Sequence, residues 1–467
     1  MMQGNFCNFA SYFETMFSKN KKHKTYYTSA LALAIPIIIA QLGHTLVQTS
    51  DTMIIGHFLG KISLAASSLA HSVFMMVLVF GLGIAYGLTP LIAQASGKNN
   101  KEEIAKLLTN SIWINLIFSI LLFCGVYYGS MFVMQHADQD PLVVQEAKPY
   151  LLVLSISIFP LMIFSAFKQF AEGLGFTKQA MRITIWGNVL NVILAIIFVR
   201  GMFGIAPMGI AGVGIATLTD RILMMVVMVL YVLKSKHFQP YISQFNFFSI
   251  QKKRIKSILK LGTPVAFQYF FEVSAFAGAS LIAGKISALD QAAHNVAITL
   301  ASMTYMIGLG ISGATTIKVG NSLGKENYPR LKTFAKVSYH IILVYTTCTA
   351  IFFAIFNYPL ASLMTKDLDV IALAAQLLII AGIFQLFDGT QVVGLGILRG
   401  MGDVNIPTLI TLLAYWGVGL PSGYYMGVHL GFGIQGVWYG LTFALLTSSF
   451  LLYLRYRVMI KKKLAIS

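Results

Sequence analysis

Three acidic residues stand inside long apolar stretches of this sequence. Glu272 lies in YFFEVSAFAGAS, Asp388 in FQLFDGTQVVG and Asp51 in QTSDTMIIG. A charge at the centre of a bilayer costs about 2.5–3.5 kcal/mol on insertion scales, so an acid in such a segment is a candidate for function. No lysine or arginine stands at comparable depth in these three segments. A structural ion pair is therefore the weaker explanation, and binding of something from outside the chain is the stronger one.

The expected chemistry depends on what relieves the charge of these acids. Burial favours the protonated form of a carboxyl group, so each acid can take up a proton. A metal ion or an organic cation bound at Asp51, Glu272 and Asp388 would have the same effect, and Na⁺ would need several converging oxygens where H⁺ needs one carboxyl group. The sequence leaves the choice between Na⁺ and H⁺ open. Asp51 lies in the outer part of its segment, where simple hydration is a competing interpretation.

Aromatic side chains surround Glu272 in the sequence. Tyr269, Phe270 and Phe276 could stack on flat, positively charged compounds, because an aromatic face attracts a cation. One helix face cannot present all of them, so ordinary packing or lipid contact is expected for at least half.

Other polar residues in apolar segments have more modest interpretations. His44 precedes Asp51 by two helical turns and lies on roughly the same face. It could relay protons with Asp51, although a hydrogen bond to a neighbouring helix is the commoner outcome. The adjacent residues Asp220 and Arg221 are interpreted as a mutually neutralising, locally hydrated pair.

The elements that position these residues are membrane-spanning helices. Of the 467 residues, 57% are hydrophobic and only 11% are charged, whereas about a quarter are charged in an ordinary soluble domain. The apolar runs are long enough to cross a bilayer, which takes roughly 20 residues in a helix. We expect an all-α polytopic membrane protein with twelve spans, at 29–56, 63–92, 107–128, 148–171, 182–200, 209–233, 258–284, 291–317, 335–357, 370–398, 405–427 and 434–455.

The distribution of positive charge orients these spans. The formal net charge is +18, and all but six of the 34 lysines and arginines fall on the side of the N-terminus when loops are assigned alternately. The positive-inside rule then places both termini in the cytoplasm. The basic run at 252–256 is expected to contact anionic lipid and not nucleic acid. The six exceptions are Lys61, Lys148, Arg200, Arg221, Lys285 and Lys366.

The two halves of the sequence resemble each other. IPIIIAQ at Ile35–Gln41 aligns with TPVAFQY at Thr263–Tyr269, and GKNN at Gly97–Asn100 aligns with GKEN at Gly324–Asn327. A repeat after six crossings keeps its orientation, which predicts two six-helix lobes related by an axis along the membrane normal. The expected boundaries are a cytoplasmic segment at 1–28, an N-lobe at 29–233, a cytoplasmic loop at 234–257, a C-lobe at 258–455 and a basic tail at 456–467.

The acids do not follow the repeat, which makes them candidates for lobe-specific sites and not for folding. The offset places His44 opposite Glu272, Leu161 opposite Asp388 and Ala279 opposite Asp51.

Motifs for enzymatic chemistry are absent from the sequence. There is no Walker A motif, no HExxH and no nucleophile elbow, and the three cysteines, Cys7, Cys124 and Cys348, show no paired spacing. We therefore expect no enzyme, no cofactor and no disulfide framework. An ion gradient would have to supply the energy for transport.

The sequence resembles the multidrug and toxic compound extrusion (MATE) family, and its NorM-type branch in particular. The resemblance runs from Ile35 to Arg457 and rests on VQTSDTMIIG, LGTPVAFQYFFEV, AAHNVA, GATTIKVGNSLG and FDGTQVVGLGILRGMGD, in this order. It implies a V-shaped, two-lobe exporter of cationic drugs and dyes that is driven by inward Na⁺ or H⁺, and we expect a monomer.

The resemblance also assigns site residues. Family carboxylates map onto Asp51, Glu272 and Asp388, which would be the metal ligands if the ion is Na⁺. Polar positions of the family's N-lobe cation site map onto Asn191 and Thr217, and Gln391 is a further candidate contact. Where relatives carry Asp or Asn four residues after this asparagine, the present sequence has Ala195. That departure weakens the N-lobe site and shifts weight to the C-lobe acids.

Two other functions compete with drug export. A lipid-linked oligosaccharide flippase of the same superfamily would line its cavity with several Arg or Lys to hold a diphosphate, whereas these spans carry acids. A membrane receptor or scaffold is disfavoured because no appended soluble domain is apparent.

Overall fold

The computed structural model describes residues 21–136 and 140–464, and this part of the chain is helical throughout with no strand. Eleven helices or helix pairs are long and apolar enough to cross a membrane, and a twelfth span at 405–429 is divided into α-helical and π-helical turns. The elements are α2 (Lys21–Phe58), α3 (Lys61–Tyr86), α4 (Leu88–Gly97), α5 (Lys101–His136), α6 (Pro141–Ile156), α7 (Ile158–Gly173), α8 (Thr177–Arg200), α9 (Gly209–Lys234), α10 (Gln239–Ile242), α11 (Lys252–Ile286), α12 (Ala288–Gly324), α13 (Tyr328–Ser362), α14 (Leu368–Gly400), α15 (Asn405–Leu412), η1 (Leu413–Gly419), α16 (Leu420–Tyr424), η2 (Tyr425–His429) and α17 (Gly433–Leu464).

The all-α fold expected from the sequence is confirmed, and all twelve predicted spans fall on these helices. The helices extend beyond the predicted spans, as α2 does before residue 29 and α17 does after residue 455. Hydropathy marks only the apolar part of a helix, whereas the hydrogen-bonded backbone continues into the lysine- and arginine-rich interface.

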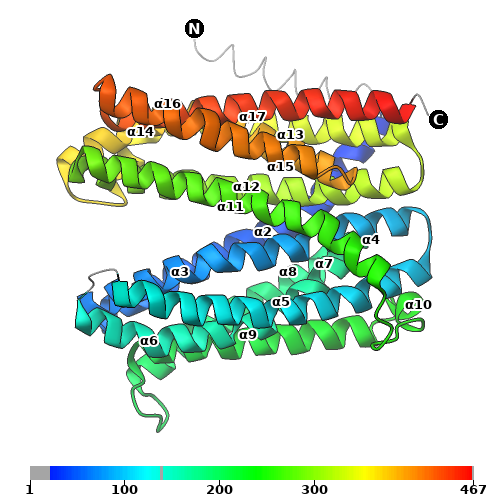
Figure 1. Ribbon diagram of the computed structural model, residues 1–467, viewed down its shortest axis with the longest axis horizontal. Helices are drawn as coiled ribbons and strands as arrows, with labels where there is room; N and C mark the ends of the chain where they lie inside the picture. The colour runs from blue at the N-terminus through cyan, green and yellow to red at the C-terminus, as the bar shows by residue number, and fades with distance from the viewer. Residues whose placement is uncertain (1–20, 137–139, 465–467) are drawn as a thin grey trace.

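The helices form two bundles, α2–α9 and α11–α17, which Figure 1 shows one below the other. At one end each bundle has its own apolar core, formed by residues between Ile54 and Ala216 in the first bundle and between Ala275 and Leu445 in the second. At the other end the cores are shared. Ala266 of α11 joins the core of the first bundle, and Ala34 of α2 joins that of the second. The bundles are therefore fused at one end and separate at the other.

Close glycine contacts make the fused end possible. A Cβ atom at Gly97 would overlap the main chain of Asn321, and one at Gly324 would overlap the main chain of Gln94. Gly97 and Gly324 occupy equivalent positions of the sequence repeat. The contact between them is thus pseudo-symmetric, as an axis along the membrane normal requires. We call this contact the glycine seam.

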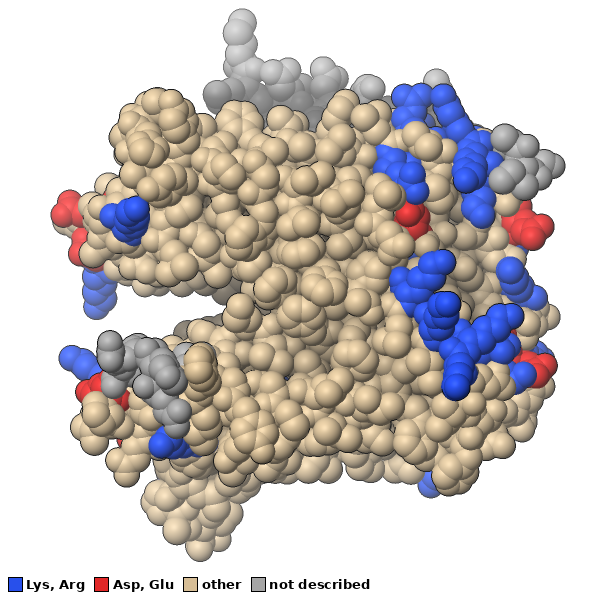
Figure 2. Space-filling model, in the orientation of Figure 1, with Lys and Arg blue, Asp and Glu red and all other residues tan. Residues whose placement is uncertain are grey.

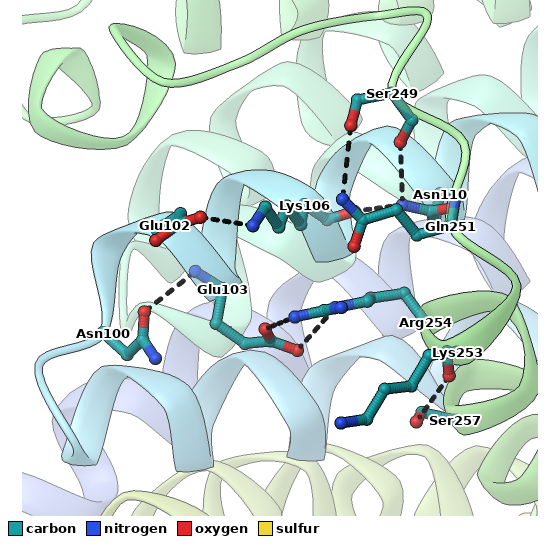
Figure 3. A network of polar contacts seen from close by, with 10 residues as sticks. All are labelled: Asn100, Glu102, Glu103, Lys106, Asn110, Ser249, Gln251, Lys253, Arg254 and Ser257. Atoms are coloured by element: carbon teal, nitrogen blue, oxygen red, sulfur yellow. Dashed lines mark hydrogen bonds and ion pairs between the residues drawn. The ribbon is translucent and has the colours of Figure 1, made fainter.

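The fused end is also the basic end. Lys and Arg gather over the N-terminal part of α11 (Figure 2), next to the connection at 235–251 that joins the bundles. This connection is fixed to α5 by the polar network in Figure 3. Arg254 donates to both carboxylate oxygens of Glu103, at 2.6 and 3.3 Å. The backbone N–H of Gln251 donates to Asn110 Oδ1 at 2.7 Å. Polar contacts thus hold the connection and the basic start of α11 against the first bundle.

Candidate functional site

A cavity of about 780 Å³ lies between the two bundles. The first bundle contributes lining residues from α2, α3 and α6–α9, and the second from α11, α12 and α14. Figure 2 shows the surface hollowed between the bundles at the end opposite the basic cluster. The cavity is of the size that holds a drug-sized molecule. It brings Asp51, Glu272 and Asp388 to one space, together with His44, Asn191, Thr217, Tyr269 and Phe276.

One wall of the cavity carries two acids from different helices of the second bundle. Glu272 of α11 and Asp388 of α14 are each only 6% exposed. The Tyr305 hydroxyl on α12 interacts with the Glu272 carboxyl group. Asp388 Oδ1 has no hydrogen-bond partner among the described residues, and none of the described lining residues on this wall is Lys or Arg. The wall is therefore built to receive a positive charge.

Aromatic rings flank these acids. Phe276 lies between Phe384, at 6.1 Å between ring centroids, and Tyr415, at 5.9 Å, and Phe276 and Phe384 both line the cavity. Such faces suit a flat cation. Two candidate residues lie elsewhere. Phe270 packs on Phe80 of α3 with centroids 5.0 Å apart, and Gln391 donates to the Tyr415 hydroxyl at 3.0 Å. Neither of these two residues lines the cavity.

The opposite cavity wall, from the first bundle, has several hydrogen-bond acceptors and few hydrogen-bond donors. Asn191 Nδ2 donates to Thr217 Oγ1 at 3.2 Å. Asp51 Oδ1 and Asn191 Oδ1 remain without hydrogen-bond partners within the described residues. Ala195 is fully buried on the same helix as Asn191 and supplies no oxygen. The described residues form no cluster of three or more His, Cys, Asp or Glu that could hold a metal, so a cation here would also need neutral oxygens.

Asp220 and Arg221, predicted to neutralise each other, form no contact ion pair. The ion pairs in the described part of the chain do not include Arg221. Adjacent residues on a helix point in different directions, so they do not face each other. Instead, Arg221 Nη1 donates to Ser157 Oγ at 2.6 Å, and its Cζ lies 5.2 Å from the Phe74 ring centroid. Both Asp220 and Arg221 line the cavity.

A second, smaller cavity of about 50 Å³ lies toward the fused end. Lys168 and Glu172 of α7 line it and form a buried ion pair at 4.0 Å. Arg399 of α14 approaches from the other bundle, donates to Gln268 Oε1 at 3.3 Å and lies over the Tyr269 ring. Charged residues of both bundles thus line this smaller cavity, which lies between the large cavity and the fused end.

Sequence reasoning missed several residues of the large cavity, chiefly Tyr305, Phe384 and Arg221. Tyr305 could have been found from its place in the middle of an apolar span. A buried tyrosine hydroxyl usually has a hydrogen-bond partner, so it indicates a polar neighbour. Its partner is on another helix, which periodicity along one helix does not identify.

Known proteins share this architecture. The model of the family described as MatE matches residues 36–197 and 264–425, once in each half of the chain. This chain belongs to the MATE family. It is 30% identical over 456 residues to a probable multidrug resistance protein NorM of Agrobacterium fabrum, covering 97% of this chain and 98% of the relative. It is 32% identical over 441 residues to the multidrug resistance protein MdtK of Yersinia pseudotuberculosis, covering 94% and 96%.

Solved MATE structures share the fold. One, described as the outward-facing conformation of a multidrug resistance MATE family transporter of the MOP superfamily, has a TM-score of 0.86 at 21% identity and covers 94% of this chain and 96% of its own. Another, of MATE in the bent conformation, has a TM-score of 0.87 at 20% identity, with coverages of 96% and 99%. The protein is therefore a multi-pass membrane transporter of the two-lobe MATE fold, and α2–α9 and α11–α17 are its N-lobe and C-lobe.

Proposed function

We propose that this MATE transporter is a cation-coupled antiporter that exports lipophilic, often cationic drugs and toxic compounds across the inner membrane. The observation that carries the proposal is the C-lobe wall. Glu272 and Asp388 face one drug-sized cavity between the lobes, with no described Lys or Arg on their wall to neutralise them. The names of the NorM and MdtK relatives support drug efflux as the activity.

The mechanism rests on mutual exclusion at these two carboxylates. The cavity opens away from the basic end (Figure 2), and the positive-inside rule places that end in the cytoplasm. In this state, open to the outside, Glu272 and Asp388 bind the incoming Na⁺ or H⁺, and the exported cation leaves. After the lobes rock to open the basic end, the ion leaves and a cytoplasmic drug occupies the same acids. One monomer suffices for this cycle, because both walls belong to one chain.

The aromatic residues have a separate part in this mechanism. Phe276, Phe384 and Tyr269 bind the flat apolar body of the drug, whereas the acids bind its charge. Substrates would therefore share a positive charge next to an aromatic or lipophilic surface.

The runner-up is the lipid-linked oligosaccharide flippase. The large cavity presents two cationic side chains, Lys168 and Arg221, and Lys168 is already paired with Glu172. That leaves little positive charge to hold a diphosphate, so drug export is the better-supported function.

The proposal is tested with a fluorescent cationic dye in everted membrane vesicles. We expect Glu272→Gln and Asp388→Asn each to abolish gradient-driven dye transport at wild-type expression. The matched control is Asp369→Asn, which changes the same chemical group at an exposed position on α14. Imposing a Na⁺ gradient or a pH gradient separately identifies the coupling ion. Normal transport by both variants would remove the acids from the mechanism.

A further inference from the structure

Four exposed lysines lie on one face of α11 where this helix begins. They are Lys252, Lys253, Lys256 and Lys260, and we call them the lysine row. At 3.6 residues per turn and 1.5 Å per residue, they lie within about 100° of the helix circumference and along about 12 Å of its axis. Figure 2 shows the basic cluster over this part of α11. The row therefore presents one continuous positive face to the outside of the molecule.

The opposite face of the same helix segment is fixed to the N-lobe. Ile258 is buried in an apolar core that it shares with Leu107 and Leu108 of α5. Arg254 donates to both carboxylate oxygens of Glu103 on α5 (Figure 3). These contacts set the rotation of α11 about its axis, and the lysine row consequently faces outward.

The lysine row has no carboxylate partner within the described part of the chain. None of the ion pairs there includes one of these four lysines. The two acids of the adjoining network are already engaged, Glu103 with Arg254 and Glu102 with Lys106, as Figure 3 shows. Neighbouring like charges repel one another, so an anion from outside the chain would stabilise the row.

Exposed aromatic rings border the lysine row. Phe247 and Phe248 precede α11 in the connection, and Phe248 is 81% exposed. Trp113 of α5 fixes this segment, because its Nε1 donates to the Phe247 carbonyl oxygen at 2.8 Å and the two rings lie 5.1 Å apart. Gln251 binds Asn110, about one turn before Trp113 on α5. The rings therefore lie deeper along α5, away from the basic end, than the start of the lysine row.

The lysine face of α11 continues as apolar surface. Phe267 lies two turns after Lys260 on the same face, is exposed, and lines neither cavity. Lysines, interfacial aromatic rings and exposed apolar surface thus follow one another along the outside of α11. This order matches the phosphate, the interfacial region and the acyl chains of a phospholipid. A soluble anion would make no use of the rings.

We propose that the lysine row, Phe248 and Phe267 bind an anionic phospholipid of the cytoplasmic leaflet. The lysines hold the headgroup phosphate as point charges, and the acyl chains lie along α11 past the two phenylalanines. The site is outside the transport cavity, so it depends neither on the exported compound nor on the coupling ion. It lies on the helix that passes from the N-lobe core at Ile258 to the C-lobe core at Ala275.

The test measures quenching of tryptophan fluorescence by brominated lipid, with the full-length transporter in phosphatidylcholine nanodiscs. Trp186→Phe and Trp416→Phe together leave Trp113 beside the site and the fully buried Trp438 as a constant background. Brominated phosphatidylglycerol should quench Trp113 as much as an about tenfold higher mole fraction of brominated phosphatidylcholine does, because each lysine at the membrane surface adds attraction for anionic lipid.

Two kinds of variant locate the preference. Changing all four lysines of the row to Gln should remove it. The matched control makes the same change of charge at four other exposed lysines, on α13 and α17, and should keep it. The control carries Lys332→Gln, Lys336→Gln, Lys461→Gln and Lys462→Gln. With Trp113→Phe and Trp186→Phe, the exposed Trp416 becomes the reporter, and it should show no preference because 405–429 contains no Lys or Arg.

Equal quenching of Trp113 by the two lipids would overturn the proposal, and so would a preference that survives neutralisation of the row. If the fourfold variant does not fold, Lys253→Gln with Lys256→Gln should lower the preference about threefold. Added NaCl should weaken the preference of the intact row. Inorganic phosphate at matched ionic strength should not weaken it further. Displacement of the lipid by phosphate would identify a soluble anion as the occupant and would overturn the lipid assignment.

Discussion

The hydroxyl group of Tyr305 on α12 interacts with the Glu272 carboxyl group on α11. This contact joins two neighbouring helices of the C-lobe at the cavity wall, and Asp388 enters the same wall from α14. Three helices thus position one acidic site, and the tyrosine is its neutral polar member.

We predict that Tyr305→Phe weakens binding of a cationic dye. A hydrogen bond to a charged group contributes about 1.5–3 kcal/mol, so the dissociation constant should rise by about 10- to 100-fold. Fluorescence polarisation with the purified protein measures this constant. The control is Tyr345→Phe, because the Tyr345 hydroxyl donates to the Thr304 carbonyl at 3.2 Å and does not line the cavity. Equal dye affinity in both variants would exclude Tyr305 from the site.

The two phenylalanines of α11 should differ in their effects. Phe276→Ala removes a cavity face next to Glu272, and loss of about 1 kcal/mol of cation–aromatic interaction should weaken binding of a flat cationic dye about fivefold. Phe270→Ala should instead lower thermal stability and spare dye affinity, since Phe270 packs on Phe80 between the lobes. Dye binding and melting temperature are measured on the same samples. A larger loss of affinity in Phe270→Ala would contradict this division.

The glycine seam should not tolerate a side chain. Gly324→Val would overlap the Gln94 main chain, and overpacking of this kind costs about 1–3 kcal/mol or more. We expect a lower melting temperature and reduced dye transport in vesicles. Gly129→Val is the control, because a Cβ atom at Gly129 of α5 meets nothing within 4 Å. Wild-type stability and transport in Gly324→Val would show that the lobes do not need this close approach.

The ion pair between Arg254 and Glu103 should contribute modestly to stability. Their side chains are 22% and 32% exposed, and pairs of this kind contribute about 0.2–1 kcal/mol. A double-mutant cycle with Arg254→Ala and Glu103→Ala, measured by thermal unfolding, should give a coupling energy in this range that falls at high salt. The more exposed pair Lys106–Glu102 should give a smaller value. A coupling that does not respond to salt would argue against an electrostatic origin.

The sequence was sufficient for the spans and for the repeat. Apolar length determines where a helix can cross a bilayer, and the paired glycines at 97 and 324 mark equivalent positions whatever the packing. It was also sufficient to single out Glu272 and Asp388, because an acid without a basic partner is conspicuous in an apolar segment. These inferences need only the local composition of each helix.

Contacts between helices were not accessible in the same way. Phe270 and Phe276 are both aromatic residues near Glu272 in the sequence, yet one packs between the lobes and the other lines the cavity. Arg221 was predicted to neutralise its chain neighbour Asp220, whereas its hydrogen bond is to Ser157, between α6 and α7. Which face of a helix meets which partner depends on how the bundle is assembled.

The glycine seam also bears on how the two halves of the gene could diverge. Gly97 and Gly324 sit against each other's helices across the pseudo-twofold axis, so a larger residue in either copy obstructs the other. A substitution at either of these two positions is therefore constrained by the other. Glu272 and its counterpart His44 both line the cavity between the lobes, and these two positions differ between the halves. The repeat is therefore kept where the lobes touch at the seam, whereas at the cavity the two halves carry acids at different positions.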